Sequence, residues 1–73
     1  MKTEFEYIKF AELTTGEIDK TRWRCYNKKY DEELGEIYWY SRWRQYIYSP
    51  TVQALYSAGC LNDIAEFLKQ LKP

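Results

Sequence analysis

The sequence predicts an α+β fold, in which a three- to four-stranded antiparallel sheet carries one C-terminal helix packed on one face. Between residues 21 and 48, aromatic and β-branched residues form short segments in which one type of side chain recurs at every second position, as it does along strands. Between residues 57 and 71, apolar residues recur every three or four positions, as they do along a helix. Because the connections between the strand-like segments are short, the pattern favours a meander.

The first twenty residues carry the weakest pattern of the chain. Residues 4–10 alternate imperfectly between apolar and polar side chains and predict a first strand. Residues 11–20 contain threonine, glycine and aspartate, which are typical of a loop. We therefore expect the sheet to lie mainly within residues 21–49.

A six-residue pattern occurs twice in the strand-like region. Residues 21–26 read Thr-Arg-Trp-Arg-Cys-Tyr, and residues 41–46 read Ser-Arg-Trp-Arg-Gln-Tyr. Side chains alternate along a strand, so each copy places its tryptophan on one face and its arginines and tyrosine on the other. We expect Trp23 and Trp43 to lie in the core, as parts of two strands under the same constraint rather than of a functional duplication.

Alternation and turn residues define the order of elements in this region. We expect, in chain order, a strand at 21–27, an exposed charged hairpin loop at 27–33, a strand at 34–40, a tight turn around Ser41 and Arg42, and a strand at 43–48. Pro50 ends the last strand because proline cannot donate to a ladder. The side chains expected to face the helix are Trp23, Cys25, Ile37, Trp39, Trp43 and Ile47.

The C-terminal segment predicts a helix over residues 58–71. Ser57 is a candidate N-cap, because its hydroxyl can accept from the first unpaired N–H groups of a helix. The apolar stripe comprises Cys60, Leu61, Ile64, Ala65, Phe67, Leu68 and Leu71. The opposite, polar face comprises Asn62, Asp63, Glu66, Lys69 and Gln70.

The composition predicts one small domain spanning residues 1–73. Aromatic residues make up 19% of the chain and supply large side chains for a small core. Eleven basic and eleven acidic residues cancel, which argues against a general polyanion binder and favours self-association. The N-terminus is charged where a signal peptide is apolar, and no apolar run approaches the length that spans a bilayer, so we expect a soluble, cytoplasmic protein.

The sequence does not indicate a catalytic, metal or cofactor site. It contains no histidine, so neither a Ser-His nor a Cys-His pair can form. Cys25 and Cys60 are both expected on core-facing sides, where a thiol behaves as a small apolar group. Two thiols without an imidazole are too few for zinc, and the sequence has no glycine-rich phosphate loop. We therefore expect a protein that is not an enzyme and binds no cofactor or metal.

Residues 34–46, Leu-Gly-Glu-Ile-Tyr-Trp-Tyr-Ser-Arg-Trp-Arg-Gln-Tyr, and the helix after them resemble a family of small, uncharacterised bacteriophage and prophage proteins. That family shows a Trp-Tyr-x-x-Trp-Arg-x-Tyr signature followed by a Ser-Ala-x-Cys-Leu-x-x-Ile-x-x-Phe-Leu helix. The matching positions here are Trp39, Tyr40, Trp43, Arg44 and Tyr46, then Ser57, Ala58, Cys60, Leu61, Ile64, Phe67 and Leu68. The resemblance covers residues 21–71 and implies a mobile-element origin and a fold, and it leaves the function open.

The predicted outer face of the sheet is the candidate functional surface. Its arginines and tyrosines are Arg22, Arg24, Tyr26, Tyr38, Arg44, Tyr46 and Tyr48. These residue types are enriched at interfaces, which predicts binding to a protein partner or to a second copy of the chain. An alternative is single-stranded nucleic acid, whose bases stack on tyrosines and whose phosphates pair with arginines. A third, structural interpretation is cross-strand cation–π contacts and ion pairs between the arginines and Glu36.

Overall fold

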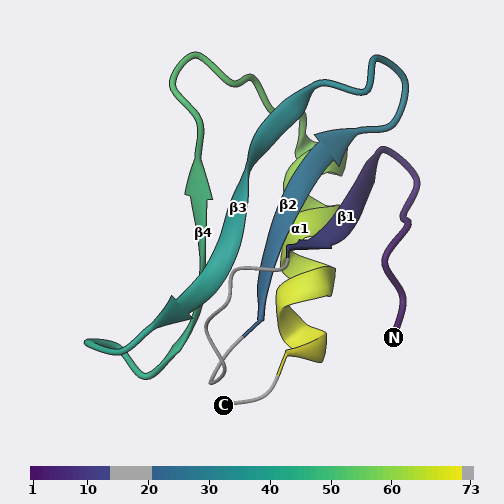
Figure 1. Cartoon of the computed structure of the whole chain (residues 1–73). Helices are drawn as coiled ribbons and strands as arrows, with labels where there is room; N and C mark the ends of the chain where they lie inside the picture. Colours follow the sequence, from purple (N-terminus) through teal and green to yellow (C-terminus); the bar gives the residue numbers. More distant parts are fainter. Residues whose placement is uncertain (14–20, 72–73) are drawn as a thin grey trace.

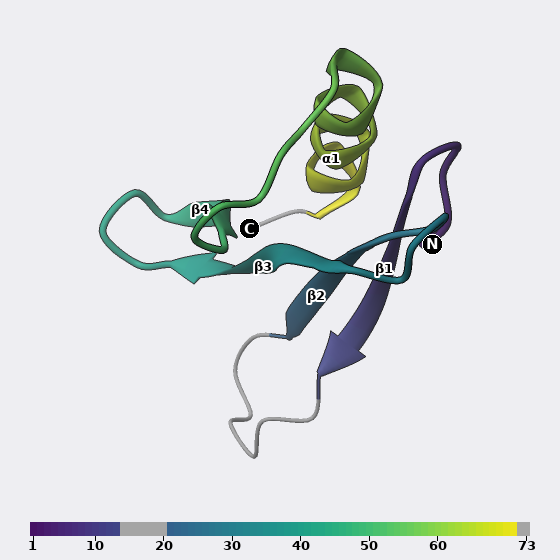
Figure 2. The ribbon, with the colours of Figure 1, turned by 90° about the horizontal axis from the view of Figure 1, so that it is seen from above.

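The computed structural model of the protein describes residues 1–13 and 21–71 (Figure 1). Its elements are β1 (Ile8–Leu13), β2 (Arg22–Asn27), β3 (Glu33–Tyr40), β4 (Gln45–Pro50) and α1 (Ala58–Gln70). The strands pair antiparallel in the order β1-β2-β3-β4, and α1 lies over one face of the sheet (Figure 2). The predicted α+β meander with one C-terminal helix is confirmed. No helix in the described part of the chain is long and apolar enough to cross a membrane.

The N-terminal part of the chain supplies the first edge of the sheet. β1 begins at Ile8, later than the strand predicted from residue 4, and it continues to Leu13. Residues 11–13 were expected to open a loop, but they are strand because each of them pairs with a residue of β2. The rest of that expected loop, residues 14–20, lies outside the described residues.

The core lies between the sheet and α1 and is centred on Phe67. This helix residue is fully buried, its ring stacks on Phe10 with 3.9 Å between centroids, and it meets Trp23 edge-on at 5.1 Å. The buried apolar residues are Phe5, Ile8, Phe10, Trp23, Cys25, Leu34, Ile37, Cys60, Ile64 and Phe67. Burial of these large rings and aliphatic side chains is the main stabilising contribution in so small a domain.

α1 starts as predicted, but its buried face is rotated from the predicted stripe. The Ser57 hydroxyl caps the helix by accepting from the N–H of Cys60 at 3.1 Å. Leu61 is 54% exposed, whereas Asp63, expected on the polar face, is only 6% exposed. Asp63 is buried because its carboxylate accepts the main-chain N–H of Tyr7 at 2.9 Å. This bond satisfies a buried polar group and ties the N-terminal segment to the helix.

A bulge at the start of β3 anchors the return of the chain from the sheet to the helix. The register between β2 and β3 shifts after Cys25, which leaves Leu34 as the extra residue on β3. The side chain of Leu34 is buried, and its carbonyl oxygen accepts from the N–H of Thr51 at 2.9 Å and from the hydroxyl of Tyr56 at 2.6 Å. These bonds hold the segment that follows β4 against the sheet.

The turn before β4 is longer than predicted. Residues 41–44 form the turn, in place of the tight turn expected at Ser41 and Arg42, and they pair Tyr40 with Gln45. β4 therefore begins at Gln45, two residues later than the predicted strand. Because opposite residues share a face, the pairing with Tyr40 decides which side chains of β4 point to the helix.

The predicted faces of this strand were consequently wrong. Tyr46 and Tyr48 pair with residues on the face that α1 covers, and both pack against the core, whereas Ile47 points away from the helix. Trp43 lies in the turn and is 63% exposed, so the expectation that it lies in the core was also wrong. Arg44 ends the turn with a positive φ of 54°, a conformation that takes it out of the strand.

Candidate functional site

The sheet face opposite α1 is the candidate functional surface, and we call it the open face. Within residues 1–13 and 21–71, no helix or strand packs on it (Figure 2). Cross-strand partners share a face, so the pairs Arg24 with Glu36 and Tyr38 with Ile47 define it. The open face comprises Lys9, Ala11, Leu13, Arg22, Arg24, Tyr26, Glu33, Glu36, Tyr38, Tyr40, Gln45, Ile47 and Ser49.

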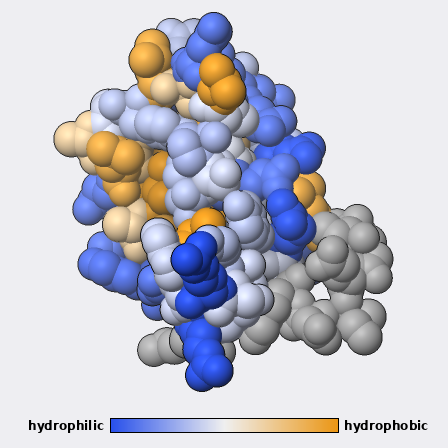
Figure 3. All heavy atoms as spheres, turned by 90° about the vertical axis from the view of Figure 1, so that its left-hand side faces the viewer, coloured by the Kyte–Doolittle hydropathy of each residue, from blue (hydrophilic) through white to orange (hydrophobic). Residues whose placement is uncertain are grey.

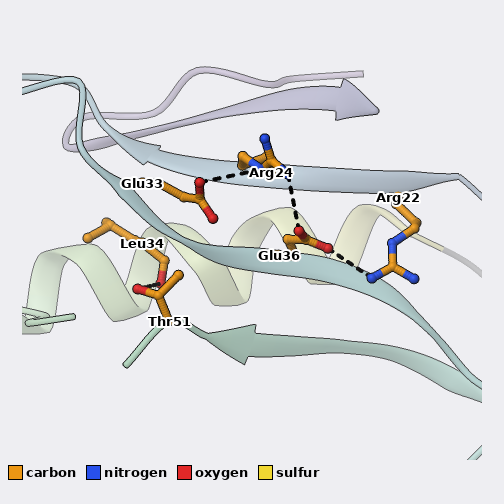
Figure 4. A network of polar contacts seen from close by, with 6 residues as sticks. All are labelled: Arg22, Arg24, Glu33, Leu34, Glu36 and Thr51. Atoms are coloured by element: carbon orange, nitrogen blue, oxygen red, sulfur yellow. Dashed lines mark hydrogen bonds and ion pairs between the residues drawn. The ribbon is translucent and has the colours of Figure 1, made fainter. Parts of the chain in front are cut away.

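Glu36 is the centre of an ion-pair network on the open face (Figure 4). Its carboxylate accepts from the guanidinium of Arg22 at 2.9 Å and from that of Arg24 at 3.3 Å. The Nε of Arg24 lies 3.7 Å from the carboxylate of Glu33. The hydrogen bond from Arg22 is the main reason why the pKa of Glu36 lies below its ordinary value. The carboxylate therefore stays ionised and keeps both guanidinium groups partly neutralised.

The aromatic rings of the open face also contact cations. The guanidinium of Arg22 lies 4.5 Å from the ring centroid of Tyr38, and the ammonium of Lys9 lies 5.9 Å from that of Tyr26. Lys9 additionally pairs with Asp31 at 2.7 Å. The cross-strand contacts that the sequence indicated for its arginines are thus present, and Lys9, Arg22 and Arg24 all have partners within the chain.

A shallow cavity hollows the open face beside this network. It has a volume of ≈ 280 Å³ and is lined by Arg22, Glu33, Gly35, Glu36, Tyr38, Ser49, Pro50 and Thr51. Strands β2, β3 and β4 all contribute to it, so it spans the middle of the sheet. The cavity makes the open face concave beside Glu36 and Tyr38.

The structure brings together four of the seven residues predicted from the sequence and separates the other three. Arg22, Arg24, Tyr26 and Tyr38 share the open face. Tyr46 packs edge-on against Trp39 on the helix side of the sheet, with 5.4 Å between ring centroids. Tyr48 lies on the same side, and Arg44 lies in the turn before β4. These three residues do not contribute to the open face.

Tyr48 has a structural role that explains how a phenol lies so close to the core. Its hydroxyl is 2.8 Å from that of Tyr56, and the Tyr56 hydroxyl in turn donates to the carbonyl of Leu34. Because Tyr56 has only one hydroxyl proton, Tyr48 must be the donor in the pair of tyrosines. Burial is the main cause that raises the pKa of Tyr48, so it remains a neutral donor.

Sequence reasoning missed a second concave region of the molecule. This cavity of ≈ 680 Å³ lies among three segments that are far apart in the sequence, and its lining includes Tyr7, Lys28, Tyr30, Leu55 and Cys60. Tyr7, Tyr30 and Leu55 are large side chains that are exposed. None of them belonged to a predicted core face, and this was the one feature of the sequence that could have indicated the cavity. The ammonium of Lys28 already donates to the carbonyl of Phe5 at 2.9 Å.

The thiols and carboxylates of the described residues form no recognisable reactive centre. Cys25 and Cys60 are both buried and unpaired, and burial raises the pKa of Cys25 to about 12. In the part of the chain that the structure describes, His, Cys, Asp and Glu residues form no group of three that could hold a metal. The open face displays ion pairs and aromatic rings.

Comparison with known proteins adds no relative to this description. No protein-family model, curated protein or solved structure matches the chain.

Proposed function

We propose that this protein is a non-catalytic interaction module, which binds a protein partner or another copy of itself through the open face of its sheet. The observation that carries the proposal is the neutralised pair of guanidiniums around Glu36. Arg22 and Arg24 present donors and planar surfaces without a strong positive field, which suits the mixed charges of a protein surface.

The balance of charge on the open face favours a protein over a nucleic acid. Lys9, Arg22 and Arg24 each lie within ion-pair distance of a carboxylate. Phosphate binding would require the arginines to leave Glu36, or the phosphate to approach a carboxylate. Single-stranded nucleic acid remains the alternative that the same residues suggest, and it predicts an affinity that falls with salt.

The aromatic rings supply the apolar part of the proposed interface. Tyr26 and Tyr38 flank the ion-pair network, and Ile47 adds an aliphatic side chain on β4. Tyrosine and arginine are frequent hot-spot residues, because each combines a large contact area with directional hydrogen bonds. The shallow cavity beside Tyr38 would receive one side chain of the partner.

The proposal includes an origin and a cellular location. The signature that runs from Trp39 to Tyr46 supports a bacteriophage or prophage origin through its resemblance to that family. Small phage proteins often act by binding host factors, which fits a module without catalytic groups. We accordingly propose a cytoplasmic host protein as the partner.

Affinity capture from a bacterial lysate, with and without nuclease, tests the proposed function. The immobilised wild-type protein is compared with Tyr38→Ala on the open face and with Glu66→Ala on the exposed side of α1. We expect a protein to be retained by the wild type and by Glu66→Ala, to be lost with Tyr38→Ala, and to be insensitive to nuclease. Retention that persists with Tyr38→Ala, or that nuclease abolishes, contradicts the proposal.

A further inference from the structure

The two edges of the sheet are protected to different degrees. The β1 edge is covered in part by the preceding segment, since Glu4 forms a bridge with Lys9 and the N–H of Phe10 donates to Thr3. β1 also carries the charged residues Lys9 and Glu12. β4, with the sequence Gln-Tyr-Ile-Tyr-Ser-Pro, carries no charge, and within the described residues it pairs only with β3. An uncharged, uncovered edge is the kind of strand that pairs with another chain.

The main chain of β4 has hydrogen-bonding groups available on its outer side. The N–H of Thr51 donates to Leu34 of β3, and in an antiparallel pair the bonding residues alternate. The alternation directs the N–H and C=O groups of Tyr46 and Tyr48 away from β3. An edge strand in solution satisfies such groups with water, and a second strand can replace that water.

The view onto this edge agrees with its composition. Figure 3 faces the β4 side of the molecule, and weakly polar and hydrophobic side chains fill most of the middle of the view. The most strongly hydrophilic side chains lie mainly around and below this area. Trp43 precedes β4 and is 63% exposed, and Val52 follows β4 and is 91% exposed. An exposed apolar side chain thus lies near each end of the uncharged strand, and at the first end Trp43 stands between the exposed Arg42 and Arg44.

We infer that β4 is a homodimerisation strand, which pairs antiparallel with β4 of a second copy of this chain. In the register that uses both outward-facing residues, Tyr46 of each copy pairs with Tyr48 of the partner subunit, and Ile47 lies opposite Ile47 of the partner subunit. A two-fold axis perpendicular to the sheet then passes between the isoleucines. This symmetry joins the two four-stranded sheets into one and keeps both helices on the same side.

The apolar residues at the ends of β4 are complementary under this symmetry. Antiparallel pairing places the start of one strand beside the end of the other, so the turn that carries Trp43 lies near the segment that carries Val52 of the partner subunit. Both residues are exposed in the isolated chain and would be covered in the dimer. The zero net charge of the chain adds no long-range repulsion between the copies.

The dimer is distinct from the open-face interaction. The edge contact uses the main chain of β4, whereas Arg22, Glu36 and Tyr38 stay on the open face of each copy. Pairing at β4 would make the two open faces continuous and double the binding surface. Because Ile47 belongs to both surfaces, Tyr38→Ala tests partner capture and the mass in solution tests the dimer, so the two losses are measured separately.

Disulfide trapping tests both the edge and its register. In Ile47→Cys the two new thiols lie opposite each other in a non-hydrogen-bonded pair, with Cα atoms about 4.5 Å apart, which a disulfide can bridge. Ala11→Cys, exposed on the open face of β1, is the matched control. Mild oxidation should convert most of Ile47→Cys to a covalent dimer on a non-reducing gel and leave Ala11→Cys monomeric. Equal trapping of both variants, or of neither, overturns the inference.

The mass in solution provides a second test without new thiols. Sedimentation equilibrium of the wild type should give twice the mass of the chain. Ile47→Lys places two ammonium groups at the two-fold axis and should give the mass of one chain, with an unchanged circular dichroism spectrum. A monomeric wild type, or a dimer that survives in Ile47→Lys, contradicts the assignment of β4.

Discussion

The guanidinium of Arg22 lies 2.9 Å from the carboxylate of Glu36 on the neighbouring strand and 4.5 Å from the ring of Tyr38. Arg24 approaches the same carboxylate at 3.3 Å. One acidic side chain in the middle of the sheet thus holds both arginines of the first Arg-Trp-Arg segment. The open face is therefore rich in arginine and tyrosine without being a strongly positive surface.

Replacement of Glu36 should change how stability depends on pH. The pKa of Glu36 is lowered in the folded chain, so its ionised form contributes stability above the unfolded pKa of about 4.3. That contribution disappears as the pH falls through the lower, folded pKa. We expect Glu36→Gln to be about 0.5–1 kcal/mol less stable than wild type at neutral pH, with the difference shrinking in acid. Urea unfolding from pH 7 to pH 2 measures the effect, and a constant difference would be the wrong outcome.

Removal of the Tyr48 hydroxyl should destabilise the protein without changing its fold. Tyr48→Phe deletes the donor to Tyr56 but leaves the bond from Tyr56 to Leu34 intact, so we expect a loss of about 1 kcal/mol. Tyr56→Phe removes the acceptor of Tyr48 and the donor to Leu34 together, and it should cost more. Thermal unfolding of both variants gives the order, with Tyr30→Phe in the exposed loop as the control. Equal stability of all three would contradict this hydrogen-bond chain.

Gly35 should not tolerate a side chain. A Cβ at this position would meet the main-chain oxygen of Ser49 at 2.5 Å and the hydroxyl of Tyr48 at 2.6 Å. Because a strand backbone cannot move aside freely, Gly35→Ala should lose roughly 1–3 kcal/mol of unfolding free energy. Gly59→Ala is the comparison, since the three atoms nearest to its Cβ all belong to the ring of Tyr7, which is half exposed and can turn aside. Denaturant unfolding should show a larger loss for Gly35→Ala than for Gly59→Ala.

Phe67 should be the most sensitive position on α1. Its ring is fully buried and contacts Phe10 and Trp23, so Phe67→Ala should cost about 3–5 kcal/mol, enough to unfold much of a small domain. Leu61→Ala removes a side chain that is mostly exposed and should have little effect. Circular dichroism at room temperature distinguishes the two variants. A folded Phe67→Ala with near wild-type stability would show that the core is not centred on this ring.

The elements of the fold could be predicted because their signals are local. The N-cap at Ser57 and the helical period after it placed α1 to within a residue, and the alternation around Trp23 placed β2. The short connections correctly indicated a meander. These patterns depend on residues close together in the sequence, so they can be recognised in a single sequence.

The faces of β4 could not be predicted because they depend on the length of one turn. With the turn at residues 41–44, Tyr46 and Tyr48 face the helix, and Trp43 is left outside the strand. Hydrophobicity suggested the reverse, since tryptophan and isoleucine are more apolar than tyrosine. The hydroxyl of Tyr48 finds its partner in Tyr56, which no local pattern reveals.

The candidate site could be predicted only where it depends on local alternation. The sequence correctly predicted that Arg22, Arg24, Tyr26 and Tyr38 share the open face, because alternation along β2 and β3 is a local signal. The burial of Asp63 against Tyr7 depends on contacts between segments distant in sequence. The cavity beside Lys28 also depends on contacts between distant segments. Periodicity in the sequence predicts neither the burial of Asp63 nor this cavity.

Titration of a labelled single-stranded oligonucleotide at low salt tests most directly whether Glu36 makes the open face a protein-binding surface. The proteins compared are the wild type, Glu36→Gln, and Glu66→Gln, which makes the same change of charge on α1. We expect no binding by the wild type or Glu66→Gln, and a salt-sensitive gain of affinity in Glu36→Gln because the carboxylate shared by Arg22 and Arg24 is removed. Salt-sensitive binding by the wild type, as tight as that of Glu36→Gln, would contradict this account.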